Sequence, residues 1–220
     1  MRKGVQPLTS GSILKRMFFF ALPILLGNLF QQLYNTVDSL IVGNFLGSSA
    51  LAAVSSSGSL IFMLIGFLTG ISSGAGVIVS KFFGGNDIKN LQSTIHTTVA
   101  FGLVAGILMT IIGVVFSPQI LILMDTPESV MQESITYLKI YFSGSLFFVM
   151  YNIFVGILQA VGDSRHPLFY LIISSIVNLI LDIIFIAGFK TGVGGAALAT
   201  VISQIISALL CFIQLIRTDE

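Results

Sequence analysis

The run LQSTIHTTVAFGLVAGILMTIIGVVF, residues 91–116, contains no Lys, Arg, Asp or Glu. A helix needs about 20 mostly apolar residues to cross the hydrocarbon core of a bilayer. This run is long enough, so it predicts a membrane-spanning helix. Backbone N–H and C=O groups in lipid must form hydrogen bonds within the protein. This requirement favours a helix over an open sheet for the run and for any spans beside it.

Other apolar runs of similar length lie at 17–42, 50–79, 134–161, 168–189 and 193–216, separated by Gly, Pro, Asn and charged residues. We therefore predict an all-α polytopic membrane bundle of six transmembrane helices over residues 17–216. A tail at 1–16 and the start of a linker at 217–220 would flank it. The lipid bilayer is then an obligatory partner.

Composition agrees with a membrane protein and excludes several other classes. Only 9% of the 220 residues are charged and 55% are hydrophobic, whereas soluble domains carry about 25% charged residues. A net charge of +1 provides no field for nucleic acid. A single cysteine, Cys211, excludes an internal disulfide, and no metal-ligand or catalytic pattern stands out. We expect no enzyme activity and no cofactor. With no Trp in the chain, Tyr and Phe are expected to mark the membrane interfaces.

Lys and Arg are distributed asymmetrically between the two ends of the predicted helices. Basic residues concentrate on the cytoplasmic side of membrane proteins. Lys190 and Lys139 lie on one predicted side, and the other eight of the ten lie on the opposite side: Arg2, Lys3, Lys15, Arg16, Lys81, Lys89, Arg165 and Arg217. The sequence thus predicts a multi-pass protein of the plasma (inner) membrane with both termini in the cytoplasm.

Two acidic residues, Asp38 and Asp182, fall inside predicted spans. A structural ion pair is the simplest explanation, but every basic residue lies in a tail, a loop or near a span end. A carboxylate without a basic partner is expected to be protonated or to hold a cation for part of the time. Acidic residues at membrane depth are usually functional, and we favour that interpretation.

Polar neighbours of these carboxylates occur at helical spacing. Asn178 precedes Asp182 by four residues, and Thr200 lies on the next span. At about 1.5 Å per residue, Asp38, Asp182 and Thr200 lie roughly 6–11 Å below the outer boundary, with Asn178 one turn deeper. Stripes of this kind also hold helices together. We expect the weaker polar positions to line a cavity or contact substrate: Gln31, Gln32, Asn35 and Gln204.

Gly-x-x-x-Gly spacing occurs at Gly43/Gly47, Gly66/Gly70, Gly70/Gly74 and Gly102/Gly106. Such pairs allow helices to approach closely. With 22 glycines in the chain, chance matches are also expected, so these pairs do not identify a contact by themselves.

Three stretches together resemble the multidrug and toxic compound extrusion (MATE) transporters. They are LPI at 22–24 continuing to QQLYNTVD at 31–38, GILQAVGD at 156–163 with Pro167, and NLILD at 178–182 followed by GGAALAT at 194–200. The resemblance covers residues 14–217. It implies an antiporter that exports amphipathic, often cationic compounds in exchange for H⁺ or Na⁺. It also implies a cation-responsive site at Asp38, Asn178, Asp182 and Thr200. If Na⁺ is the coupling ion, the first three of these residues would coordinate it.

The family has twelve helices in two six-helix lobes, and this chain resembles the N-terminal lobe alone. The resemblance thus implies a missing C-terminal lobe or a second six-helix subunit as partner. Two alternatives remain open: a lipid-linked oligosaccharide flippase of the same fold superfamily, or a non-transporting truncated membrane subunit. Such a flippase is expected to place basic residues in a central cavity, and no predicted span interior carries one.

Overall fold

A computed structural model describes residues 12–219, and every element within that range is helical. The elements are α1 (Ile13–Leu46), α2 (Ser48–Gly84), α3 (Ile88–Leu123), α4 (Glu128–Ser143), α5 (Ser145–Ala160), α6 (Arg165–Asp182), the π-helical turn η1 (Ile183–Gly188) and α7 (Val193–Asp219). Five helices or helix pairs in this range are long and apolar enough to cross a membrane, and the bent α4–α5 pair makes six. The predicted all-helical membrane bundle is therefore confirmed.

The predicted span at 134–161 is not one continuous helix. It divides at Gly144 into α4 and α5, whose axes are bent by 50°. A Cβ at Gly144 would come within 2.7 Å of both Val201 methyl groups, so glycine at the bend allows α7 to pack against it. The predicted span at 168–189 also departs from a regular α-helix, because it ends in η1 directly after Asp182.

The helices extend further than the predicted spans at both chain ends. α1 begins at Ile13, inside the predicted tail, and residues 1–11 of that tail lie outside the described residues. α7 continues to Asp219, through most of the predicted linker, whose last residue, Glu220, also lies outside. Polar residues at a membrane surface are compatible with helix, so hydropathy alone underestimates helix length.

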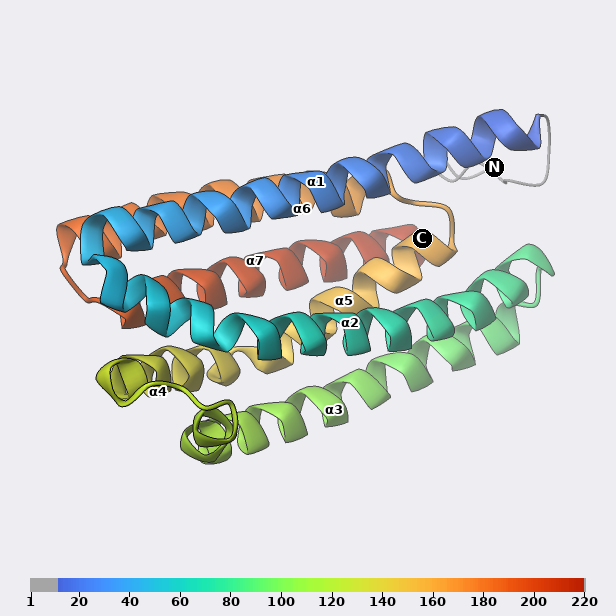
Figure 1. Ribbon diagram of the computed structural model, residues 1–220. Helices are drawn as coiled ribbons and strands as arrows, with labels where there is room; N and C mark the ends of the chain where they lie inside the picture. Colours follow the sequence, from blue (N-terminus) through green and yellow to red (C-terminus); the bar gives the residue numbers. More distant parts are fainter. Residues whose placement is uncertain (1–11, 220) are drawn as a thin grey trace.

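Successive spans run in opposite directions. In Figure 1, α1, α3 and α6 run from right to left and α2, α5 and α7 run back, so the described ends of the chain lie at one end of the bundle. The α2–α3 and α5–α6 connections lie at this same end. We call it the tail end and the opposite one the loop end. Which of them faces the cytoplasm remains a prediction from the Lys and Arg distribution.

Local sequence explains the connections. Gly47 has φ 89° and separates α1 from α2, a conformation that glycine adopts without a Cβ penalty. Asp87 is the N-cap residue of α3, and its side chain accepts a hydrogen bond from the backbone N–H of Asn90 at 3.2 Å. Gly162, with φ 93°, turns the chain between α5 and α6.

The core lies around α5, and α3 forms the outer wall. Phe148, Ile153 and Ile157 of α5 are buried in one cluster with residues of α2, α3 and α7. α3 exposes a band of large apolar side chains: Val104, Ile107, Leu108, Ile111, Ile112 and Val115. A soluble protein would bury such a band, so this surface suits contact with lipid.

Candidate functional site

Asp38 on α1 and Asp182 at the end of α6 approach each other closely. Their carboxyl groups are neighbours, close enough for their charges to interact. Asp182 has no exposed surface and Asp38 is partly buried. Among the described residues, neither oxygen of Asp182 has a hydrogen-bond partner, and Oδ1 of Asp38 has none. Buried acceptors without donors are rare, and here three of them gather at one point.

Asn178 and Thr200 complete this group. The Asn178 Nδ2 donates to Thr200 Oγ1 at 3.4 Å, and that hydroxyl donates to the Ala196 carbonyl at 3.0 Å. The four-residue spacing of Asn178 and Asp182 places both on one face of α6. The amide oxygen of Asn178 is buried without a partner in the described chain, so it adds a fourth unpaired acceptor.

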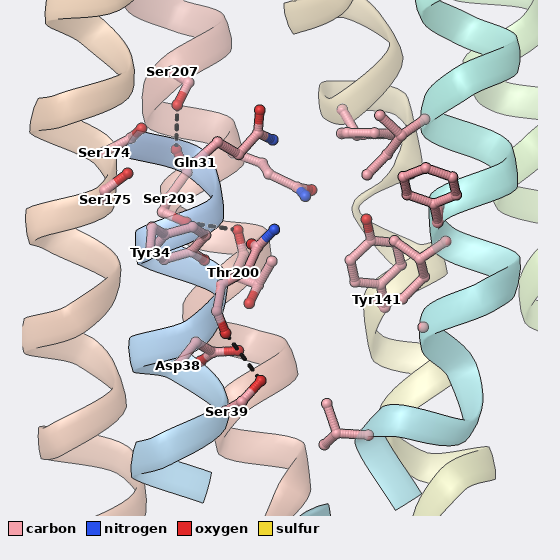
Figure 2. A pocket seen from close by; sticks show the side chains of 18 of the residues that line it. Gln31, Tyr34, Asp38, Ser39, Tyr141, Ser174, Ser175, Thr200, Ser203 and Ser207 are labelled. Atoms are coloured by element: carbon pink, nitrogen blue, oxygen red, sulfur yellow. Dashed lines mark hydrogen bonds between the residues drawn. The ribbon is translucent and has the colours of Figure 1, made fainter. Parts of the chain in front are cut away.

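A cavity of about 480 Å³ adjoins this group. Residues of α1, α2, α4, α5, α6 and α7 line it, including Asp38 and Thr200. Asn178 and Asp182 are not among the lining residues, because they lie behind the cavity wall. In Figure 2, Asp38 and Thr200 lie close together on one side of the space and Tyr141 lies across from them. The site therefore has one carboxyl open to the cavity and one enclosed behind it.

Of the four weaker polar positions, Gln31, Asn35 and Gln204 line the cavity. Gln32 does not; it lies exposed on another side of α1. Gln32 points about 100° away from Gln31 around the α1 axis, which turns it out of the cavity wall.

The sequence reasoning missed the tyrosines. Four of the five Tyr residues line the cavity: Tyr34, Tyr137, Tyr141 and Tyr151. The interfacial role expected for Tyr is therefore wrong for these four. Spacing gave a usable signal, since Tyr34 lies four residues before Asp38 and Tyr137 four before Tyr141. The rings of Tyr137 and Tyr141 stack at 6.2 Å.

The lining has a consistent chemical character. It combines the Asp38 carboxyl with hydroxyls, amides and aromatic rings, and contains no Lys, Arg or His among the described residues. Carboxyl and carbonyl oxygens suit hard cations, and aromatic faces attract organic cations. The arrangement can therefore hold a proton or small cation beside a space of small-molecule size.

Comparison with known proteins gives a consistent result. The MatE family model matches residues 23–184. The chain is 36% identical over 208 residues to the probable multidrug resistance protein YoeA of Bacillus subtilis, covering 93% of this chain and 45% of that protein. It is 26% identical over 208 residues to the multidrug export protein MepA of Staphylococcus aureus, covering 94% and 46%.

Solved structures agree. A crystal structure of MATE in the bent conformation superposes with a TM-score of 0.91 at 26% identity, covering 100% of this chain and 48% of that one. A transporter of the MOP superfamily from Pyrococcus furiosus gives a TM-score of 0.89 at 27% identity, covering 97% and 47%. The chain thus spans about half the length of the relatives it matches. The family-model match and the shared fold show that the chain belongs to the MatE family.

Proposed function

We propose that this chain forms the N-terminal half of an antiporter in the plasma membrane, with both ends in the cytoplasm. It exports amphipathic or cationic compounds in exchange for H⁺ or Na⁺. The observation that carries the proposal is the group of unpaired buried acceptor oxygens on Asp38, Asp182 and Asn178. They adjoin a cavity whose described lining lacks basic residues.

The coupling step follows from the two carboxyl groups. When both are ionised, two close negative charges repel each other in a low-dielectric setting. A proton shared between them, or a small cation held by their oxygens and that of Asn178, removes this repulsion. Binding and release thereby change how strongly α1 is drawn to α6. A ligand shifts a conformational equilibrium only through such a difference in affinity, and α1 is the helix that carries Asp38 into the cavity wall.

This proposal requires a partner that supplies the second half of the transport path. The chain matches about half of its relatives' length, and a transporter that alternates access moves one repeat against another around a central site. A C-terminal lobe or a second six-helix subunit would supply the other wall.

Asp38→Asn tests the function. Proteoliposomes or cells carrying the chain with its partner half are loaded with a fluorescent cationic dye, and gradient-driven efflux is followed. We expect the variant to insert normally and to lose efflux, because an amide cannot release a proton or neutralise a cation. The matched control, Glu133→Gln, removes an exposed charge on α4 and should transport normally. Undiminished efflux from Asp38→Asn would overturn the coupling role.

The same assay separates the alternatives. A flippase of lipid-linked oligosaccharide would move a fluorescent polyprenyl-pyrophosphate lipid instead of the dye. For the related Pyrococcus furiosus transporter, reverse polarity of the binding pocket suggests a different function. Here the lining carries Asp38 and no described basic residue to hold a pyrophosphate. A non-transporting subunit would move neither compound.

A further inference from the structure

A column of polar side chains winds along α6. His166, Tyr170, Ser174, Asn178 and Asp182 follow each other at intervals of four residues. Each step rises about 6 Å and turns about 40° around the helix axis, so these residues occupy successive levels between the tail end of the bundle and the enclosed carboxyl. A polar side chain at every turn is not expected of a helix that only faces lipid or only packs against its neighbours.

A second polar series faces it from α7. The two helices meet through side-chain contacts at both ends of the column. Near the carboxyls, Asn178 donates to Thr200. Near the tail end, the Tyr170 hydroxyl donates to Gln214 Oε1 at 3.1 Å. We call the polar contact line between α6 and α7 the α6–α7 seam.

The middle of the seam borders the cavity. Ser174, Ser203 and Ser207 are almost fully buried and all three line the cavity. Figure 2 shows Ser207 and Ser203 one after the other along α7, leading toward Thr200 and Asp38. Each of these serines donates to a backbone carbonyl, and its oxygen remains able to accept from water. A cavity of about 480 Å³ can hold several waters, since one occupies about 30 Å³.

The seam opens to solvent at His166. Its Nδ1 lies 2.6 Å from Oδ2 of Asp163, and 47% of its side-chain surface is exposed. The same nitrogen lies 3.5 Å from Nε2 of Gln214. Arg165 and Arg217 are exposed at this end of the bundle as well. An imidazole ring carries both a proton donor and a proton acceptor, so His166 suits the solvent-exposed end of a proton path.

The other direction from Asp182 is almost entirely apolar. Val42, Ala50, Ile186, Val193 and Ala197 form a buried cluster on the loop-end side of the carboxyls, together with Tyr137, which also lines the cavity. Asp38, in contrast, faces the cavity. Asp38 therefore opens directly on the cavity, whereas Asp182 lies behind its wall, next to the seam whose middle serines line the cavity.

We propose that the α6–α7 seam is a proton path joining Asp182 to the solution at the tail end through water, the Tyr170 hydroxyl and the His166 ring, with the Gln214 amide holding that hydroxyl in place. This rests on the proposed coupling role of the carboxyls. A proton leaves the Asp182 carboxyl, and each water or hydroxyl along the seam accepts one proton and passes one on. The last proton leaves from the His166 ring into bulk water, so one proton is released and every relay group is restored.

The test measures proton exchange directly. The purified chain is reconstituted in liposomes in one orientation, and a pH step is imposed on the side where α7 ends. Time-resolved infrared spectroscopy follows the carbonyl band of protonated carboxyl groups, and the Asp182→Asn variant identifies the contribution of Asp182. Transport is not needed for this measurement, so the half-length chain suffices.

Tyr170→Phe removes one hydroxyl from the seam and keeps the ring. His166→Ala removes the imidazole ring at the solvent-exposed end of the seam. We expect each to slow exchange at Asp182 about tenfold, less than the 10²–10⁴-fold typical of direct acid–base groups because water replaces part of the path. Added imidazole should restore the rate of proton exchange at Asp182 in the His166→Ala variant. The control is His96→Ala, which alters the chain's other histidine, an exposed residue on α3.

The outcomes separate the two proposals. Slow exchange with rescue by imidazole supports the path. Wild-type exchange rates in both variants would overturn it, and so would slow exchange that imidazole does not restore, because that indicates a structural role. Neither result affects the coupling proposal, which fails instead if Asp38→Asn transports normally. If no Asp182 band appears in the wild-type chain, both proposals fail.

Discussion

Replacement of Asp182 by Asn should stabilise the lobe while it disables coupling. Three buried acceptors are unpaired where Asp38 and Asp182 meet: Oδ1 of Asp38 and both oxygens of Asp182. In the Asn variant one of these oxygens becomes an N–H₂ donor, and that donor can pair with the Asp38 oxygen. Two of the three unpaired acceptors are thereby removed, and one of two close charges disappears.

The size of the effect follows from this comparison. An unpaired buried polar atom costs about 1–3 kcal/mol, and Asn occupies nearly the same volume as Asp. At the lower value, two atoms give a stabilisation of about 2 kcal/mol. For a chain of this length, that raises Tm by about 4–8 °C.

The chain contains its own reporter for this measurement. Its single cysteine, Cys211, is fully buried, so a thiol-reactive fluorescent dye reacts with it when the lobe unfolds on heating. Asp125→Asn is the control, because Asp125 is exposed and its φ of 56° suits Asn equally well. Its Tm should stay within the error of the wild type. An unchanged or lowered Tm for Asp182→Asn would refute the idea that these carboxyls are unsatisfied.

Further predictions concern packing and orientation. Gly113→Ala should lower stability by about 1–3 kcal/mol, because its Cβ would overlap the Phe142 ring, while Gly66→Ala, with open space around it, should be neutral or stabilising in the same thiol assay. In a Cys211→Ala background, Asn86→Cys should react with a membrane-impermeant maleimide only from the cytoplasmic side, and Asp125→Cys only from outside. Labelling of both positions from one side would contradict the predicted topology.

Glycine spacing illustrates where sequence reasoning lacks resolution. Of the four Gly-x-x-x-Gly pairs, Gly102/Gly106 lies against Ile153 and Leu146 of α5, so close approach of α3 requires both glycines. Gly66, Gly70 and Gly74 have the same spacing and open space around them. The pattern is identical in each case, and only the position of the neighbouring helix distinguishes them.

In the candidate site, too, the sequence predicts positions along a helix but not which helices are neighbours. Helix periodicity and depth were sufficient to predict that Asp38, Asp182 and Thr200 lie at one level, because both depend on distance along a helix axis. Periodicity could not show that Asp38 faces a cavity while Asp182 is enclosed, since that depends on which helices are neighbours.

The sequence by itself determined the membrane class, the all-helical bundle and the location of its charged residues, because hydrophobic length and the cost of burying charge are local properties. Tertiary structure decided the 50° bend at Gly144, the cavity with its four tyrosines and the α6–α7 seam, where Asn178 meets Thr200 and Tyr170 meets Gln214. These features arise from contacts between helices that are distant in the sequence, and such contacts depend on how the helices pack in three dimensions.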